Sequence, residues 1–275
     1  MEIQILDVRY HLEVLNFDKK STIVFLHGFT GSTKTWRGIE KALPEYKIVL
    51  IDLLGHGLTD SPEDSARYTM ELQIRDLNLL FGQLGLENFA LAGYSMGGRT
   101  ALAYACTYPQ QIEALILESA SPGLKSADER LDRQQRDSEL ALKILANGIT
   151  SFVDKWENIP LFDTQKRLPE TVKQTIRAER LHQNPLGLAN SLIGMGTGTQ
   201  KSYWSQVKQL NLPVLLVTGA MDPKFMAIAE EMKQALPKVQ HGVIEAGHAI
   251  HVEKPAEFAT MVKEYLSSNY RGGKS

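Results

Sequence analysis

The 275-residue sequence lacks the features that mark extracellular and membrane proteins. Cys106 is its one cysteine, so no disulfide can form within the chain, which suits a reducing compartment. No apolar stretch approaches the length of a membrane span, and residues 1–7 lack the basic region and apolar run of a signal peptide. We therefore expect a cytoplasmic protein that has no membrane partner.

An excess of one charge is also absent. Lysine and arginine together number 30, aspartate and glutamate 32, and the net charge is −2. This balance creates no global field for nucleic acid, and no basic stripe with interleaved aromatic residues is present. No cluster has metal-ligand spacing, so neither a metal nor another cofactor is expected. The sequence does not fix the oligomeric state, and a monomer is the simplest expectation.

Short apolar runs alternate with amphipathic segments along most of the chain. After one or two edge strands within residues 2–15, strands are expected at 22–26, 47–53, 89–94, 114–119, 212–219 and 242–245. Helices are expected at 33–43, 69–84, 96–108, 224–236 and 255–268. This alternation predicts an α/β fold, with a mostly parallel central sheet covered by helices on both faces.

Residues 122–205 interrupt the alternation. They contain no convincing strand but hold amphipathic helical stretches at about 126–146, 148–157, 170–182 and 185–195. We interpret this segment as a helical cap inserted into the α/β core. The predicted division is therefore residues 1–121 (core), 122–205 (cap) and 206–275 (core), with 271–275 as a polar tail.

The segment Gly93-Tyr-Ser-Met-Gly97 matches the pattern G-x-S-x-G between an expected strand and an expected helix. A serine on such a sharp turn has a strained backbone, and the glycines leave room for the turn. The Ser95 hydroxyl is then exposed, beside the unpaired N–H groups of a helix N-terminus. A chance glycine-rich turn is the alternative, but the apolar flanks favour a reactive serine.

A reactive serine needs a histidine to accept its proton and a carboxylate to orient that histidine. Asp222 and His248 each follow an expected strand, and the chain order Ser95, Asp222, His248 is the one described for α/β-hydrolase folds. Asp222 precedes Pro223, so a turn or a helix cap is its alternative role. His251 competes with His248, whose place after Ala-Gly favours it.

Two loops add further candidates near the same sheet edge. The backbone N–H groups of Phe29 and Met96 are suited to an oxyanion hole, although an ordinary glycine turn would also explain His27-Gly-Phe29. Asp52 and His56 also follow a strand, but Gly55-His-Gly57 indicates a structural turn in which His56 bonds to the backbone.

These motifs resemble the α/β-hydrolase superfamily along the whole chain. The matching segments are His27-Gly-Phe-Thr-Gly31, Asp52-Leu-Leu-Gly-His-Gly57, Gly93-Tyr-Ser-Met-Gly-Gly98, Asp222 and Gly247-His248. Other flanks resemble a narrower family, the 2-succinyl-6-hydroxy-2,4-cyclohexadiene-1-carboxylate (SHCHC) synthases of menaquinone biosynthesis. They are Gly93–Arg99, Ser121–Leu124 with Glu129–Arg133, and Asn184–Gln200. That family eliminates pyruvate from a cyclohexene precursor, with the triad serine thought to abstract a ring proton.

The resemblance implies roles residue by residue. Ser95, Asp222 and His248 match the triad, and Phe29 and Met96 match the oxyanion-hole donors. Further matches are implied for binding the substrate: the arginines Arg99, Arg133 and Arg180 and the pocket aromatics Tyr94 and Trp156. The match of Arg180 is the weakest, because its spacing to Asn184-Pro-Leu-Gly187 varies. Ser121 stands where some members have another polar residue.

The arginine positions also have a physical interpretation. Guanidinium groups bind carboxylates bidentately, and the implied substrate is a small polyanionic carboxylate. Arg99 follows Ser95 within one helical turn, where an unpaired buried charge is costly, although a salt bridge to a core carboxylate is its alternative role. Arg133 lies in the charge-rich run 128–137, where a solvated helix face is the alternative. Arg130 and Arg136 are expected to face solvent.

Two other functions compete with pyruvate elimination. A carboxylesterase, thioesterase or carbon–carbon hydrolase of the same fold would act through an acyl-serine intermediate. A ligand-binding receptor with an inactive triad would bind a small molecule without turnover. Triad geometry alone does not separate elimination from acyl transfer, since both place an oxyanion beside an activated serine.

Overall fold

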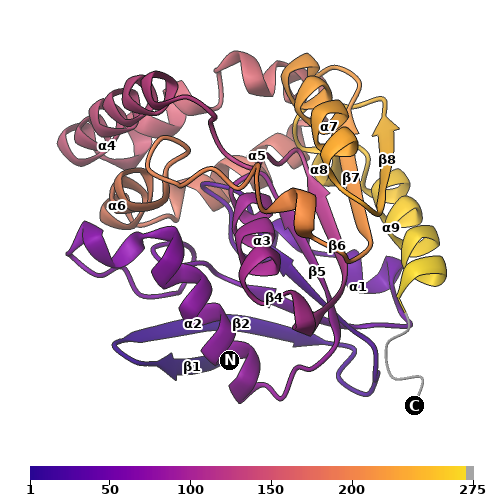
Figure 1. The fold of residues 1–275 in the computed structure, drawn as a ribbon. Helices are drawn as coiled ribbons and strands as arrows, with labels where there is room; N and C mark the ends of the chain where they lie inside the picture. The colour runs from indigo at the N-terminus through magenta and orange to yellow at the C-terminus, as the bar shows by residue number, and fades with distance from the viewer. Residues whose placement is uncertain (271–275) are drawn as a thin grey trace.

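An eight-stranded sheet runs through the centre of the protein (Figure 1), seen in a computed structural model that describes residues 1–270. The strand order is β1-β2-β4-β3-β5-β6-β7-β8. The N-terminal hairpin, β1 (Glu2–Ile5) and β2 (Val8–Leu15), is antiparallel and joins β4 antiparallel. The parallel strands are β3 (Thr22–Leu26), β4 (Lys47–Ile51), β5 (Phe89–Tyr94), β6 (Ile112–Glu118), β7 (Val214–Gly219) and β8 (Val239–Ile244). The predicted α/β class with a mostly parallel sheet is confirmed; the predicted tail at 271–275 lies outside the described residues.

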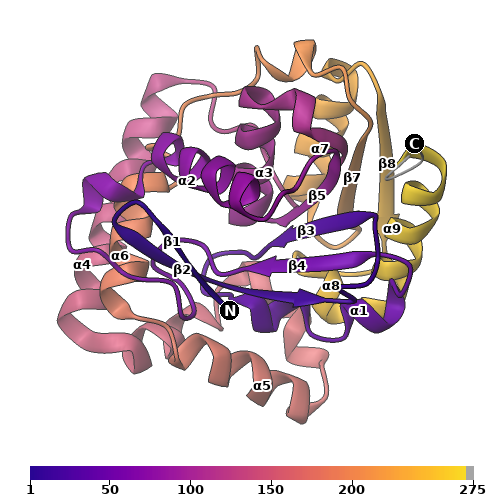
Figure 2. The same ribbon diagram turned by 90° about the horizontal axis from the view of Figure 1, so that it is seen from below.

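Helices cover both faces of this sheet (Figure 2). One face packs against α2 (Met70–Gln83), α3 (Met96–Thr107) and α7 (Pro223–Ala235). The other packs against α1 (Ile39–Ala42), α8 (Ile250–Glu253) and α9 (Pro255–Asn269). Because side chains alternate along a strand, Val24 of β3 enters the first core and Phe25 the second. Each fully buried aliphatic or aromatic side chain contributes about 1.5–3 kcal/mol, so the central strands form a rigid base for their carboxyl-end loops.

One predicted helix, at residues 33–43, is wrong. The chain there forms a 3₁₀ turn at Thr33–Trp36 and then the short helix α1. Gly38 separates the two pieces with φ 87°, a left-handed conformation that a continuous helix cannot contain. The helical periodicity of the apolar residues survives the break, because Trp36 and Ile39 both enter the second core.

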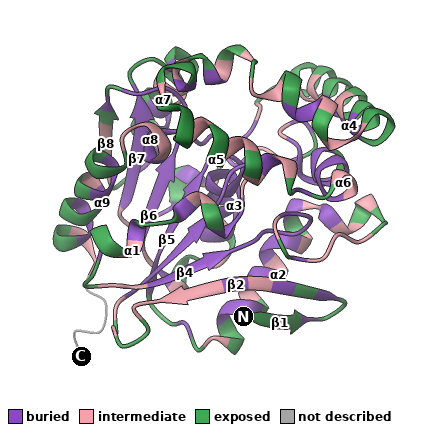
Figure 3. Cartoon of the chain, turned by 180° about the vertical axis from the view of Figure 1, so that it is seen from behind, coloured by how far each residue is buried: buried purple, intermediate pink, exposed green. Residues whose placement is uncertain are grey.

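The segment between β6 and β7 is helical, as expected. It contains α4 (Ala127–Trp156), a 3₁₀ stretch at Pro160–Arg167, α5 (Glu170–Leu181) and α6 (Pro185–Met195). Gly148 has non-helical φ and ψ of 76° and 173°, so α4 is broken between the two predicted helices 126–146 and 148–157. In Figure 3 the central strands β3 to β7 are mostly buried, whereas much of α4 and α5 is exposed. The division at residues 122 and 205 into core and cap stays a prediction.

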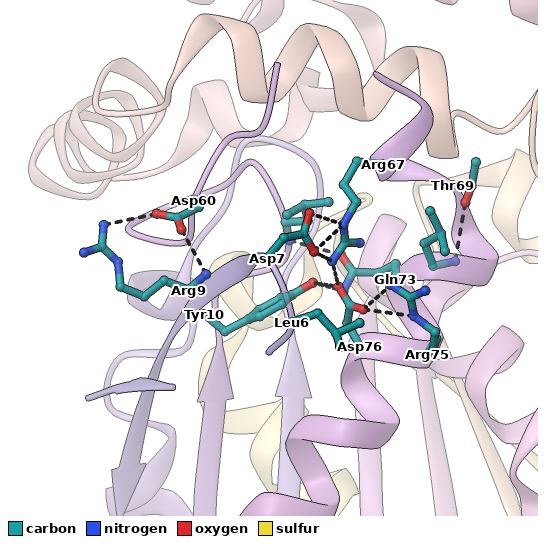
Figure 4. A network of polar contacts seen from close by, with 12 residues as sticks. Leu6, Asp7, Arg9, Tyr10, Asp60, Arg67, Thr69, Gln73, Arg75 and Asp76 are labelled. Atoms are coloured by element: carbon teal, nitrogen blue, oxygen red, sulfur yellow. Dashed lines mark hydrogen bonds and ion pairs between the residues drawn. The ribbon is translucent and has the colours of Figure 1, made fainter. Parts of the chain in front are cut away.

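A polar network ties the N-terminal hairpin to α2 (Figure 4). Arg67 Nη2 lies 2.5 Å from Asp76 Oδ2 and 2.9 Å from Asp7 Oδ1. The Tyr10 hydroxyl donates to the same Asp76 oxygen at 2.9 Å, and Arg75 lies 3.1 Å from the other oxygen. Although burial lowers the pKa of Arg67, its bonds to the two carboxylates raise that pKa above the usual value. Two carboxylates therefore compensate the charge of Arg67.

The length and apolar character of a helix decide whether it can cross a bilayer. Among residues 1–270, no helix combines the length and the apolar character that crossing a bilayer requires. The longest, α4, has 30 residues, but charged side chains recur throughout it.

Candidate active site

Ser95 lies on the turn between β5 and α3. Its φ and ψ are 51° and −106°, a strained conformation for a residue with a side chain. The turn is held against the neighbouring strand, because a Cβ on Gly97 would lie 2.2 Å from the carbonyl oxygen of Leu26. Only glycine fits there. The Ser95 side chain is thereby directed to the carboxyl edge of the sheet, the usual ligand-binding edge of α/β folds.

His248 and Asp222 meet this serine from two later loops. His248 Nε2 lies 3.0 Å from Ser95 Oγ, and His248 Nδ1 lies 2.7 Å from Asp222 Oδ2. Both the imidazole and the carboxylate are buried. Ser119 Oγ donates to the carbonyl oxygen of His248 at 2.8 Å and so fixes the loop. The structure thus joins the three predicted triad residues by hydrogen bonds of ordinary length.

Asp222 also caps a helix, which was the alternative interpretation of its sequence position. Its Oδ1 accepts from the N–H of Phe225 at 3.2 Å at the start of α7, while its Oδ2 faces His248. The two roles use different oxygens of one carboxylate, so they do not exclude each other. The helix cap instead fixes the carboxylate in the orientation that the histidine needs.

The competing histidines have other partners. His251 is buried with its Nδ1 2.8 Å from Glu118 Oε1, away from the serine. His56 bonds to the carbonyl oxygen of Leu54 at 3.1 Å, as expected of a structural turn. Asp52 accepts from the N–H groups of Thr33 and Leu58 at 2.6 and 2.8 Å. None of these three side chains faces Ser95 through a hydrogen bond among the described residues.

A cavity of about 500 Å³ opens above Ser95 and His248. Phe29 and Met96 line it beside the serine, and Met96 is the first residue of α3, where backbone N–H groups lack intrahelical partners. Its aromatic lining consists of Phe29, Tyr94, Trp156, Phe162, Trp204 and Phe225. Tyr94 packs edge-on against His251, and Trp156 stacks on Phe152 with ring centres 5.4 Å apart. The four predicted residues outside the triad and the arginines therefore all lie in this lining: Phe29, Met96, Tyr94 and Trp156.

Arg99 lies at the floor of the cavity. Only 9% of it is exposed, and its Nη1 donates to the carbonyl oxygen of Met195 at 2.9 Å and to Gln200 Oε1. No carboxylate forms an ion pair with it within residues 1–270, so the salt bridge considered from the sequence is absent there. Burial, followed by the nearby charge of Arg133, lowers the pKa of Arg99 to about 10. It remains a cation at neutral pH with neutral acceptors only.

Further charged side chains line the cavity from α4 and α7. Arg133 is partly exposed and its Nε lies 2.8 Å from Asp137 Oδ1. Arg136 lines the cavity too, although solvent exposure alone was expected of it. Lys224 was not foreseen from the sequence; its position two residues after Asp222 was the available signal, since Asp222 opens α7 at the cavity.

Arg180 is placed outside this cavity. It is buried on α5, its Nη2 lies 3.4 Å from Gln165 Oε1, and its guanidinium lies 4.7 Å from the ring centre of Phe162. Phe162 lines the cavity of Ser95, whereas Arg180 lines a neighbouring one. The structure therefore separates Arg180 from Arg99 and Arg133, with which the resemblance grouped it.

A metal site requires several His, Cys, Asp or Glu side chains grouped around one point. Among residues 1–270, no three His, Cys, Asp or Glu side chains are grouped as a metal site requires. The expectation that neither a metal nor another cofactor takes part stays a prediction. Without a metal or other cofactor, Ser95 and His248 can remove or transfer a proton, beside a helix N-terminus and cationic side chains.

Comparisons with known proteins agree with this geometry. A family model described as the alpha/beta hydrolase fold matches residues 21–255. A Bacillus subtilis (strain 168) protein is provisionally named 2-succinyl-6-hydroxy-2,4-cyclohexadiene-1-carboxylate synthase. It is 47% identical over 95% of this chain and 96% of its own length. The synthase of that name from Enterobacter sp. (strain 638) is 32% identical over 89% of this chain and 91% of its own.

Solved structures give the same result. MenH from S. aureus superposes with a TM-score of 0.90 at 35% identity and covers 94% of this chain and 98% of its own. A thermophilic esterase from Thermogutta terrifontis, solved with malate bound, has a TM-score of 0.85 at 25% identity and covers 98% of both chains. Fold, site geometry and sequence likeness agree, and the chain belongs to the 2-succinyl-6-hydroxy-2,4-cyclohexadiene-1-carboxylate synthase family of the α/β-hydrolase superfamily.

Proposed function

We propose that the protein is a carbon–oxygen lyase of menaquinone biosynthesis. It eliminates pyruvate from 2-succinyl-5-enolpyruvyl-6-hydroxy-3-cyclohexene-1-carboxylate and leaves 2-succinyl-6-hydroxy-2,4-cyclohexadiene-1-carboxylate. The observation that carries this proposal is the combination of a hydrogen-bonded Ser95–His248–Asp222 triad with a buried Arg99 that lacks a carboxylate partner in the described chain. An anionic substrate would supply that partner.

The first step is removal of a ring proton by Ser95. With Nδ1–H directed at Asp222 Oδ2, His248 Nε2 accepts the Ser95 hydroxyl proton, and the serine oxygen then acts as the base. The ring C–H bond breaks and its electrons form a ring double bond. The existing ring double bond shifts by one carbon, the bond between the ring carbon and the enolpyruvyl oxygen breaks, and the departing enolpyruvate takes up a proton and becomes pyruvate.

As the ring proton leaves, negative charge develops on the oxygen of the conjugated carbonyl group, and this charge needs stabilisation. We assign this role to the backbone N–H groups of Phe29 and Met96, both of which line the cavity beside Ser95. Such donors typically contribute a rate factor of ~10²–10³ each. The chemistry consists of proton transfer and elimination, so we infer that it proceeds without a metal or other cofactor.

Arg99 and Arg133 are proposed to bind substrate carboxylates, with Tyr94 and Trp156 packing against the ring. Arg99 is buried at the floor and Arg133 partly exposed, so the two positions suit carboxylates at different depths. We assign Arg180 an indirect role, through the Phe162 ring on which it packs. We further infer that the enzyme works in the cytoplasm as a monomer.

The test uses purified protein and freshly generated substrate. Pyruvate release is followed together with diene absorbance, and a p-nitrophenyl ester serves as the parallel substrate. Stoichiometric pyruvate and diene with feeble ester cleavage would support elimination. Brisk ester hydrolysis with a burst of p-nitrophenol, and no pyruvate above the spontaneous rate, would instead support an acyl-serine hydrolase.

Ser95→Ala is the matched variant for this assay. We expect it to lower kcat by a factor of about 10²–10⁴, the usual contribution of a positioned general base. Its fold should persist, because the turn is held by backbone contacts and glycines rather than by the hydroxyl. Full activity in pure Ser95→Ala protein would remove the serine from the mechanism.

A further inference from the structure

The cavity above Ser95 carries one cation without a partner at its exposed end. Four cationic residues line the cavity: Arg99, Arg133, Arg136 and Lys224. Arg99 donates to neutral oxygens, Arg133 pairs with Asp137, and Arg136 Nε donates to a backbone carbonyl of its own helix. Within residues 1–270, the Lys224 ammonium forms neither an ion pair nor a hydrogen bond; it lies 5.6 Å from the ring centre of Phe225.

The place of Lys224 is fixed by the same turn that holds the triad. It is the second residue of α7, whose first turn is capped by Asp222. Phe225, the next residue, packs against His248 with ring centres 4.6 Å apart. The backbone of Lys224 therefore cannot shift without disturbing Asp222 and His248. The Lys224 side chain therefore starts from a fixed backbone position beside Asp222 and His248.

Burial orders the cations from the floor of the cavity to its mouth. Arg99 is buried, Arg133 is intermediate and Lys224 is exposed. Lys224 is exposed as a residue, but partial burial of its ammonium, followed by the charge of Arg133, lowers its pKa. Like charges that face one cavity repel one another, and an anion bound between them relieves that repulsion. Glu129 and Asp132 also line the cavity, so its four cations face two carboxylates.

We propose that Lys224 is a substrate-binding residue that holds the terminal carboxylate of the succinyl arm at the mouth of the cavity. This inference rests on the proposed function. The ring must approach Ser95 for proton removal, and Arg99 lies within one helical turn of that serine. The succinyl arm is the longest substituent of the ring, so its carboxylate reaches farthest toward the mouth. A lysine ammonium, with three rotatable donors, suits a carboxylate on a flexible arm.

The proposal explains how three carboxylates can be bound although Arg180 is outside the cavity. The substrate carries a ring carboxylate, an enolpyruvyl carboxylate and the succinyl carboxylate. Arg99 and Arg133 provide for two of them, and Lys224 provides for the third. Because the succinyl arm is retained in the product, Lys224 contributes to the binding of product as well as substrate, whereas a group that holds the enolpyruvyl carboxylate does not.

The test compares Lys224→Met with Lys233→Met. Lys233 lies on the same helix, is exposed, pairs with Glu230 and is absent from the cavity lining. The probes for binding are 2-succinylbenzoate, a stable dicarboxylate with the same arm, and benzoate, which lacks it, both titrated by calorimetry. For Lys224→Met we expect about tenfold weaker binding of 2-succinylbenzoate, the value of one charged hydrogen bond, and little change for benzoate. Lys233→Met should bind both as the unaltered protein does.

Kinetics with the full substrate separate the other outcomes. The expected pattern for Lys224→Met is a KM raised about tenfold, a smaller change in kcat, and partial recovery in Lys224→Arg. Unchanged binding of 2-succinylbenzoate would overturn the proposal, and a raised KM in that case would assign Lys224 to the enolpyruvyl carboxylate instead. A fall in kcat alone would show that Lys224 acts through Asp222 and would equally overturn it.

The binding measurement keeps this inference distinct from the proposed function. If the unaltered protein released no pyruvate but bound 2-succinylbenzoate through Lys224, the proposed elimination would be contradicted and the proposed carboxylate site would be supported. If it released pyruvate but Lys224→Met bound the probe normally, the reaction would stand and the assignment of Lys224 would fail.

Discussion

Arg67 and Arg99 are both largely withdrawn from solvent, but their surroundings differ. Arg67, between the N-terminal hairpin and α2, lies against Asp7 and Asp76 (Figure 4). Arg99, at the floor of the cavity, reaches only the neutral oxygens of Met195 and Gln200. Their pKa values move in opposite directions: the carboxylates raise that of Arg67, whereas burial lowers that of Arg99.

The difference in partners indicates a structural role for Arg67 and a ligand-binding role for Arg99. A buried charge that is paired with carboxylates of the chain itself fixes the relation of two elements and offers little to a ligand. A buried charge with neutral partners is unfavourable in the free protein, and it gains most when an anion arrives. Stability and activity should therefore respond separately to changes in the two regions.

Replacing Arg67 by Met should lower the free energy of unfolding by about 3 kcal/mol, because Asp76 is fully buried and loses its closest cation. Urea denaturation measures this change. Arg9→Met is the control: Arg9 pairs with Asp60 in the same region but is 54% exposed, so its loss should cost about 0–1 kcal/mol. Activity per folded molecule should remain normal in both. Equal stability of the two variants would break the comparison.

Acid should weaken the loops that carry His27 and His56, next to Phe29 of the cavity, at a higher pH than the Arg67 region. Burial lowers the pKa of His27 to about 4, and burial with the nearby His27 lowers that of His56 to about 3. Their unfolded values are near 6.5, so the stability they contribute is complete above that pH. It falls by up to about 1.4 kcal/mol per pH unit for each histidine as the pH drops toward 4. The hydrogen bond to Arg67 lowers the pKa of Asp7. The stability that the ionised Asp7 contributes is therefore lost only below about pH 4.

His56→Asn checks this assignment. Its amide can still donate to the Leu54 carbonyl, but the side chain does not titrate. The free energy of unfolding of this variant, measured in urea at pH 6.5, 5.5 and 4.5, should fall less steeply than that of the unaltered protein. Parallel pH profiles for the two proteins would contradict the prediction.

Replacing Arg99 by Met should change the free energy of unfolding by only about 1 kcal/mol or less. Removing an unpaired buried charge is favourable, whereas leaving the oxygens of Met195 and Gln200 without this donor is unfavourable, and the two effects oppose each other. Thermal or urea denaturation measures the balance. If Arg99→Met lowered the free energy of unfolding as much as Arg67→Met, Arg99 would be a structural residue and would not differ from Arg67 in role.

Much of the architecture could be predicted because it depends on local patterns. The apolar run Thr22–Leu26 is a strand with the predicted bounds, and α4 is broken at Gly148, the first residue of the second of two predicted helices. The helix at 33–43 was not correct, because its apolar spacing is helical while Gly38 has a left-handed backbone. Periodicity reports which side chains are buried, not whether the backbone is continuous.

The candidate site was predictable only where chemistry constrains the chain order. Ser95, Asp222 and His248 follow strands of a parallel sheet, so their loops must meet at one edge. Lys224 was missed because one lysine at the start of a helix has no distinctive pattern. Arg180 was grouped with the other arginines by resemblance, but the packing of α5 places it beyond Phe162. Long side chains of a helical insertion depend on tertiary packing, which spacing does not encode.

The most direct test of the account is the kinetics of Arg99→Met with two substrates. Arg99 is proposed to bind a carboxylate without touching the triad, so kcat/KM for pyruvate elimination should fall about 100-fold, roughly 3 kcal/mol. Hydrolysis of p-nitrophenyl acetate, a neutral ester that needs only Ser95 and His248, should stay within about twofold of the slow rate of the unaltered protein. An equal loss for both substrates would mean that Arg99 supports the triad, and no loss for elimination would contradict carboxylate recognition by the buried cation.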